Sequence, residues 1–181
     1  MTVQPILRFP TSRLRLLADP VTVFDAALRQ LAADLLDTLR AAPGIGIAAP
    51  HIGVAQRVVV IELSSDDGVR TYVNPRITWA SDDTVSHQEG SVSMPGMADE
   101  VTRPAHVRIS YQDLAGTERG EEADGLLAVC LQHEIDQLDG IFWLQHLSRL
   151  KRDRLIKRFE TAVRRASNHR QPPSQTTFRS G

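Results

Sequence analysis

His133, Glu134 and Gln137 form the group of residues whose types and spacing are best suited to chemistry. On a helix, the i to i+4 spacing places His133 and Gln137 on one face, one turn apart, while Glu134 points to the side. A helical metallohydrolase motif has histidines at both positions, because two imidazoles hold the metal while the glutamate transfers a proton of the bound water. Gln137 stands in place of the second histidine. Taken alone, such a pair is more typical of a core histidine beside a carboxylate than of a metal site.

Two other segments combine residue types that suit ligand binding. Residues 44–53, GIGIAAPHIG, carry three glycines and two alanines, a composition that lets backbone approach a ligand closely. Residues 87–96, HQEGSVSMPG, are expected to form a loop with an acid, glycine and two serines, whose amides could face an anion or a carbonyl oxygen. Each segment alone is a weak signal.

The apolar pattern predicts two helices that must position these residues. Residues 24–39 carry apolar side chains at helical spacing, and Pro43 and Gly44 end that helix. A second helix begins after Asp124, a good N-cap, and ends at Gly140, so that it contains His133 and Glu134.

Between the two helices the pattern changes to that of strands. β-branched runs and alternating polarity predict strands at residues 57–63, at 70–74 before Pro75, and at 107–111. Residues 113–116 have the composition of a hairpin turn. This order predicts an α+β domain with strands gathered around a central helix.

Composition limits the class of protein. The chain has 181 residues and a mass of 20.1 kDa, with 41% hydrophobic and 24% charged residues, which is typical of one globular domain. Its single cysteine, Cys130, allows no internal disulfide. We find no apolar run long enough for a membrane span, so a cytoplasmic protein without a membrane partner is expected. A net charge of -1 argues against a surface built for DNA.

The basic residues gather near the C-terminus. From Arg149 to Arg170 there are nine Lys or Arg and two acids, a local net charge of +7, while the rest of the chain carries -8. Apolar residues recur at helical spacing there, which predicts an amphipathic helix over residues 149–165. Its basic face is either simply solvated or contacts an anionic partner such as ribosomal RNA. Residues 166–181 have little to bury and are expected to be a flexible polar tail.

Taken together and in order, the three segments resemble the peptide deformylase family, whose motifs read GxGLAAxQ, EGCLS and QHExDHLxG. The resemblance extends over roughly residues 3 to 165, and it implies one domain over residues 1–165. The family fold is α+β, with small antiparallel sheets around the central motif-bearing helix and a C-terminal helix that docks on the ribosome in some members.

The resemblance also implies an activity and its residues. Peptide deformylases hydrolyse the N-formyl group from the N-terminal methionine of nascent peptides with a divalent metal, often iron or zinc. The family's ligand positions correspond to Ser91, His133 and Gln137. Glu134 matches the general acid/base, Val92 the residue whose amide helps to hold the formyl oxygen, and His51 a glutamine that also contacts that oxygen. The peptide-cradling edge corresponds to Gly44, Ile45, Gly46 and Glu89.

Only one of the three ligand positions keeps its family residue. A serine hydroxyl and an amide replace a thiolate and an imidazole, and both are poor partners for borderline-soft cations. If four ligands supply ~10 to 16 kcal/mol, losing two forfeits on the order of 5 to 8 kcal/mol. The sequence therefore predicts no metal, or a weakly bound iron or zinc, with deformylase activity lost or strongly reduced. Binding of peptide N-termini, formyl-methionyl ones included, and ribosome contact through residues 149–165 are expected to remain.

Two hydrolytic alternatives stay open at this point. The family's glutamine and histidine stand here as His51 and Gln137, as though exchanged, so His51 and His133 could bind a cation with Ser91, Glu134 or water completing the shell. Alternatively, Ser91 could act as a metal-free nucleophile with His133 as its base, facing the Val92 amide.

Overall fold

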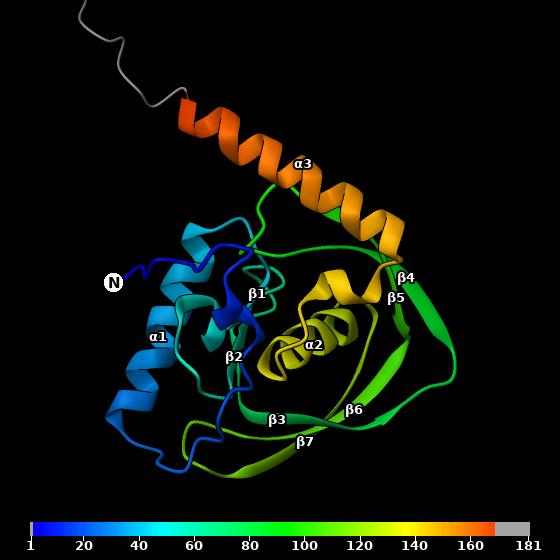
Figure 1. Cartoon of the computed structure of the whole chain (residues 1–181). Coiled ribbons are helices and arrows are strands. Elements are labelled where there is room, and N and C mark those ends of the chain that lie inside the picture. The colour runs from blue at the N-terminus through cyan, green and yellow to red at the C-terminus, as the bar shows by residue number, and fades with distance from the viewer. Residues whose placement is uncertain (1, 169–181) are drawn as a thin grey trace, which may run out of the picture. The chain divides into compact units, whose positions relative to one another are not determined.

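A computed structural model describes residues 2–168 of the chain (Figure 1). The chain divides between Leu147 and Ser148 into two compact units. The first unit contains the segments that carry the candidate site residues. The second contains the C-terminal helix, so the predicted domain end at residue 165 falls inside that helix.

The first long helix forms where the leucine spacing predicts it. Helix α1 spans Ala26–Ala41, and its N-cap Asp25 accepts hydrogen bonds from the amides of Ala27 and Leu28. Leu28, Leu35 and Leu39 are buried along one face. The apolar stripe thus packs inward, as the sequence predicts.

Five strands form one antiparallel sheet in the order β1-β2-β3-β6-β7. Their bounds are Gly46–Ala48, Val58–Ile61, Arg70–Ala80, His106–Gln112 and Glu118–Asp124. Strands β4, Thr84–Gly90, and β5, Ala98–Pro104, pair with each other in a separate sheet. The predicted turn at residues 113–116 joins β6 to β7, where Asp113 accepts amide hydrogen bonds from Ala115 and Thr117.

The position of strand β2 between two hydrophobic clusters explains why its sequence is continuously apolar. Val59 and Ile61 belong to the hydrophobic cluster that contains the residues of helix α2, Gly125–Leu138, whereas Val58 and Val60 belong to the cluster that contains those of α1. Figure 1 shows the two helices on opposite sides of β1 and β2. Both faces of the strand are therefore buried, so that alternation of polarity is lost.

Helix α2 spans Gly125–Leu138 and is the central helix. Asp124 stands at the predicted N-cap position, but its side chain makes no capping hydrogen bond. Gly140, beyond the end of the helix, has a positive φ of 74°. Most of its residues after the first turn are buried, including Leu131, Ile135 and Leu138. The predicted α+β architecture, with antiparallel sheets around a central helix, is confirmed.

Two local predictions are wrong. Strand β3 does not end before Pro75 but continues to Ala80, with a register shift between Val73 and Arg76. Asn74 adopts a positive φ of 52° in this bulge, and its side chain exchanges hydrogen bonds with the backbone of Val21. A bulge accommodates proline because the extra residue is outside the regular ladder, where the missing N–H costs nothing.

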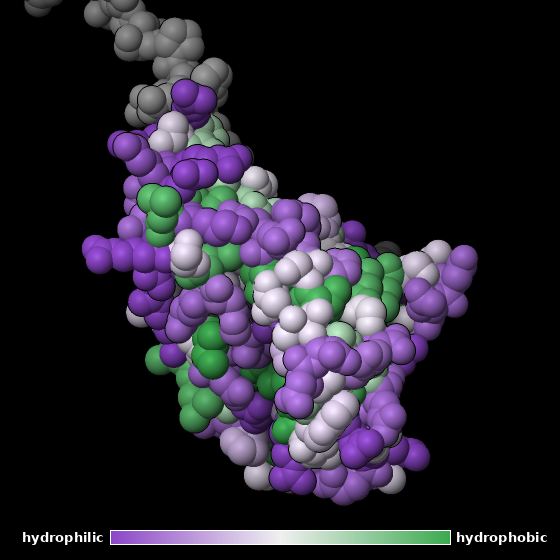
Figure 2. All heavy atoms as spheres, turned by 90° about the vertical axis from the view of Figure 1, so that its right-hand side faces the viewer, coloured by the Kyte–Doolittle hydropathy of each residue, from purple (hydrophilic) through white to green (hydrophobic). Residues whose placement is uncertain are grey.

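The second error concerns the segment 87–96, which is not all loop, because residues 87–90 form the end of β4. Most side chains of β4 and β5 are at least partly exposed, so the strands lack the apolar alternation by which strands are recognised. The right-hand side of Figure 1, where β4 and β5 lie, faces the viewer in Figure 2, and hydrophilic residues cover much of it.

Helix α3 spans Arg149–Asn168 and contains the predicted basic helix. The first residues of the predicted tail, 166–168, belong to this helix, and residues 169–181 lie outside the described part of the chain. Across residues 2–168, no helix combines the length and the apolar character that a membrane crossing requires.

Candidate active site

A pocket of about 770 Å³ opens between β1, the end of β4 and helix α2. All the predicted site residues except Gln137 line this pocket. They come from three separate stretches of sequence: Gly44, Ile45, Gly46 and His51; Glu89, Ser91 and Val92; His133 and Glu134. The fold thus brings the three motif segments to one cavity.

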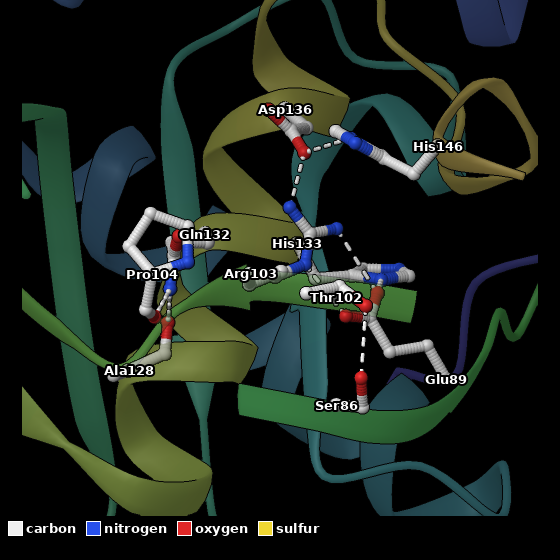
Figure 3. Close-up of polar contacts among 10 residues, drawn as sticks. All are labelled: Ser86, Glu89, Thr102, Arg103, Pro104, Ala128, Gln132, His133, Asp136 and His146. Atoms are coloured by element: carbon white, nitrogen blue, oxygen red, sulfur yellow. Dashed lines mark hydrogen bonds and ion pairs between the residues drawn. The ribbon is translucent and has the colours of Figure 1, made fainter. Parts of the chain in front are cut away.

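A chain of ion pairs positions His133 at the pocket wall (Figure 3). Glu89 Oε2 lies 2.9 Å from Nδ1 of His133, and Arg103 donates two hydrogen bonds to the same carboxylate, at 2.6 and 3.0 Å. Arg103 also donates to Asp136 at 2.7 Å, and Asp136 contacts Nε2 of His146 at 2.7 Å. Because Nδ1 of His133 is engaged, Nε2 is the ring nitrogen left for the pocket.

These contacts set the charge of the buried pair. Burial alone raises the pKa of Glu89, but hydrogen bonds with His133 and Arg103 outweigh it and lower that pKa to about 2. Burial alone lowers the pKa of His133, but the carboxylates of Glu89 and Glu134 outweigh it and the net pKa is raised. The sequence alone did not connect Glu89 with His133, and it gave no role to Arg103, Asp136 or His146. Glu89 and Arg103 are 14 positions apart, and Arg103 and Asp136 are 33 positions apart, so no local sequence pattern links these partners.

His51 and Glu134 lie side by side in the buried end of the site. Nδ1 of His51 lies 3.1 Å from the Ala48 amide nitrogen and 3.2 Å from its carbonyl oxygen. Oε2 of Glu134 is 3.8 Å from that same Nδ1 and has no hydrogen-bond partner, nor has Nε2 of His51, within the described residues. Burial raises the pKa of Glu134 to about 7, whereas burial and the nearby His133 lower that of His51 to about 3. At neutral pH His51 is uncharged, so the two do not form an ion pair.

Gly46 allows α2 to approach β1 closely. A Cβ atom at this position would lie 2.6 Å from Sγ of Cys130 and 2.8 Å from Oε1 of Glu134. Real Cβ contacts are not this short, so any other residue would displace one of these side chains. Cys130 is buried, and burial raises its thiol pKa well above the ordinary value, so the thiol stays protonated at neutral pH.

Comparison with known proteins identifies the family of the chain that carries this site. Residues 3–153 match the family model described as polypeptide deformylase. The chain belongs to the peptide deformylase family. Proteins of this family are metal-dependent hydrolases that act on the N-termini of nascent peptides.

The relatives of this deformylase-family chain carry two kinds of name. A protein of Bradyrhizobium diazoefficiens named peptide deformylase-like is 66% identical over 164 residues, which cover 91% of this chain and 96% of that protein. A protein of Methylocella silvestris named peptide deformylase is 47% identical over 170 residues, covering 91% and 87%. The crystal structure of a peptide deformylase from Legionella pneumophila superimposes with a TM-score of 0.88 at 37% identity, covering 94% of this chain and all of that one.

The deformylase family uses a divalent iron or zinc, and the residues present here do not fit such an ion. The Gln137 side chain is not among those lining the pocket, because its amide Nε2 donates to the carbonyl oxygen of Leu14 at 2.7 Å. Ser91 Oγ accepts from the Ser93 amide at 3.2 Å. Among residues 2–168, no three His, Cys, Asp or Glu side chains are grouped so that they could hold a metal ion. A single imidazole with a hydroxyl is a weak donor set.

The two hydrolytic alternatives each lack part of their arrangement. For the exchanged ligands, Nδ1 of His51 is engaged by Ala48 and Nε2 is left without a partner, but no group of three His, Cys, Asp or Glu that could hold a cation forms among residues 2–168. The serine alternative needs a bond between Ser91 and His133, and none joins them in the described chain.

Proposed function

We propose that this chain binds peptide N-termini in the deformylase pocket without hydrolysing a formyl group. The observation that carries the proposal is the hydrogen bond from Gln137 to Leu14, which commits the third ligand position to holding the N-terminal segment. The pocket has a volume of about 770 Å³ and is lined by residues of all three motif segments. Binding therefore has a site, whereas metal-assisted hydrolysis has no adequate ligand set.

The walls of the pocket suit an extended peptide. Within residues 2–168, β1 pairs only with β2, and β4 pairs only with β5, so each strand has one unpaired edge. Residues 44–46 and 88–90, at the start of β1 and the end of β4, line the pocket. An extended peptide can hydrogen-bond to such strand edges and place its first side chains in the cavity.

The protein's own groups supply little hydrolytic power without a cation. Water that is not bound to a metal has a pKa of about 15.7. Glu134, whose pKa lies at about 7, is too weak a base to generate enough hydroxide from such water. Glu134 is then a polar group of the binding site rather than an efficient general base.

The test measures formate release and peptide binding on the same preparation. We expect no formate above the buffer rate from N-formyl-Met-Ala-Ser, with or without added iron, cobalt or zinc, and measurable peptide binding by calorimetry. The matched variant combines Ser91→Cys, Gln137→His and His51→Gln, and should gain a bound metal and some formate release. Metal-dependent formate release by the unaltered protein would overturn the loss of hydrolysis, and lack of any peptide binding would overturn the binding function.

We also propose that α3 contacts the ribosome surface. Residues 149–168 include eight Lys or Arg and only two acids, which suits the phosphate backbone of RNA. Sedimentation with ribosomes should decrease steeply as salt is raised and should be lost in a variant with Arg152, Arg154 and Arg158 all changed to Glu. Sedimentation that is unaffected by these charge reversals would contradict the proposal.

A further inference from the structure

The carboxylate of Glu134 is buried at the pocket without a partner. Glu134 is 3% exposed, lines the pocket, and its Oε2 has no hydrogen bond among the described residues. The neighbouring His51 ring, whose Nδ1 lies 3.8 Å away, is 1% exposed and engaged with Ala48. A buried acceptor without a donor is costly in an empty protein and becomes favourable when a ligand supplies the donor.

The cations near this end of the pocket are already committed. Arg103 is shared between Glu89 and Asp136, and the Nδ1 atom of His133 contacts Glu89. At the rim, Arg40 donates two hydrogen bonds to Glu62. The remaining arginine that lines the pocket, Arg8, donates to the backbone carbonyl of Val92. Glu134 therefore receives no hydrogen bond from a cationic side chain of the described residues, and its attraction to His133 is through space only.

We propose that the pocket recognises the free α-ammonium group of an unformylated peptide N-terminus, with the carboxylate of Glu134 accepting one of its hydrogen bonds. The proposal rests on the peptide-binding function above and names its ligand class. An ammonium group supplies a positive charge and three N–H donors, and a charge-assisted hydrogen bond to a carboxylate is stronger than a neutral one. A formylated N-terminus has no charge and a single N–H donor, so it satisfies Glu134 less well.

The loss of the metal ligands gives this preference a physical reason. A site that holds a divalent ion has positive charge to balance its carboxylates. Here the donor set does not fit such an ion, and the two arginines that line the pocket donate to Glu62 and Val92 rather than to Glu134. A ligand that brings its own positive charge restores the balance.

The experiment compares three peptides of one sequence, Met-Ala-Ser-Arg with a free, a formylated and an acetylated N-terminus, by calorimetry on the full chain. We expect the free amine to bind at least tenfold more tightly than either blocked form. Glu134→Gln should lower the affinity for the free amine by tenfold or more and abolish the preference. Glu62→Gln, at the same pocket but already paired with Arg40, is the matched control and should keep the preference.

The outcomes separate this inference from the function on which it rests. Binding of the formylated peptide as tightly as the free one overturns ammonium recognition and leaves peptide binding standing. An unchanged preference in Glu134→Gln also overturns it. Lack of binding by all three peptides overturns both proposals. If Glu134→Gln does not fold, the ratio of affinities in the unaltered protein decides alone.

Discussion

Glu89 and His133, 44 positions apart in the chain, meet through a 2.9 Å contact between Oε2 and Nδ1. The same carboxylate accepts two hydrogen bonds from Arg103, which is only 4% exposed. Glu89 therefore both orients the imidazole at the pocket wall and neutralises a buried guanidinium. This pairing holds β4, β5 and α2 together beside the cavity.

Replacing Glu89 should destabilise the protein strongly. Glu89→Gln leaves Arg103 with one of its two carboxylate partners, and breaking a buried ion pair from one side costs about 3 to 5 kcal/mol. Urea unfolding measures the loss. Glu122→Gln, which breaks an exposed pair with Arg108, is the control and should change the free energy of unfolding by less than about 1 kcal/mol. Equal effects of the two substitutions would contradict the role assigned to Glu89.

Stability should fall steeply in acid. The pKa of Glu89 is lowered from 4.5 to about 2, so the unfolded chain binds its proton first as the pH falls below 4.5. The pKa of His51 is lowered from 6.5 to about 3, so the unfolded chain also binds that proton first between pH 6.5 and 3. Both groups therefore remove stability as the pH falls from 4.5 to 3, each by up to about 1.4 kcal/mol per pH unit.

Urea unfolding at a series of pH values checks this dependence. His51→Gln removes one of the two contributions and should make the decline between pH 4.5 and 3 shallower. Between pH 4.5 and 6.5 the raised pKa of Glu134, about 7, increases stability as the pH falls. The reason is that the folded protein binds this proton at pH values at which the unfolded chain has released it. The free energy of unfolding of the unaltered protein should therefore change less with pH in that range. If the unaltered protein and His51→Gln lose stability equally steeply between pH 4.5 and 3, the assignment to His51 is refuted.

Gly46 should not tolerate even a methyl group. Gly46→Ala places a Cβ 2.6 Å from Sγ of Cys130 and 2.8 Å from Oε1 of Glu134, and we expect a loss of about 1 to 3 kcal/mol from the overpacking. Gly120→Ala is the control, since its Cβ would meet only the Ile109 carbonyl oxygen at 3.7 Å. Adding Cys130→Ala to Gly46→Ala should recover part of the lost stability. A Gly46→Ala protein as stable as the original would show that β1 and α2 pack less closely than the structure indicates.

Ser91 should not react as an activated nucleophile. Its hydroxyl accepts from the Ser93 amide, and no bond to His133 activates it in the part of the chain described. A fluorophosphonate probe followed by mass spectrometry should leave Ser91 unlabelled under conditions that label a serine hydrolase fully. Labelling that disappears in His133→Ala would instead establish the metal-free hydrolase.

Several elements could be predicted from the sequence because short-range residue patterns determine them. The leucine spacing and Asp25 specify α1, and the apolar run 58–61 specifies a strand buried on both faces. Strand β4 escaped detection because its buried side chain is a glutamate, Glu89, held by an arginine on the neighbouring strand. Burial of a charged residue depends on a partner that local pattern does not reveal.

By itself, the sequence determined the family resemblance and showed that two of the three metal-ligand positions carry weaker donors, since both depend only on which residues stand where. Helical spacing also placed His133 and Gln137 one turn apart. Only the tertiary structure decided that His133 lines the pocket, held there by Glu89, whereas Gln137 binds the carbonyl of Leu14, 123 positions away. Side-chain direction in a core depends on hydrogen-bond partners supplied by distant segments, and these meet only when the chain is folded.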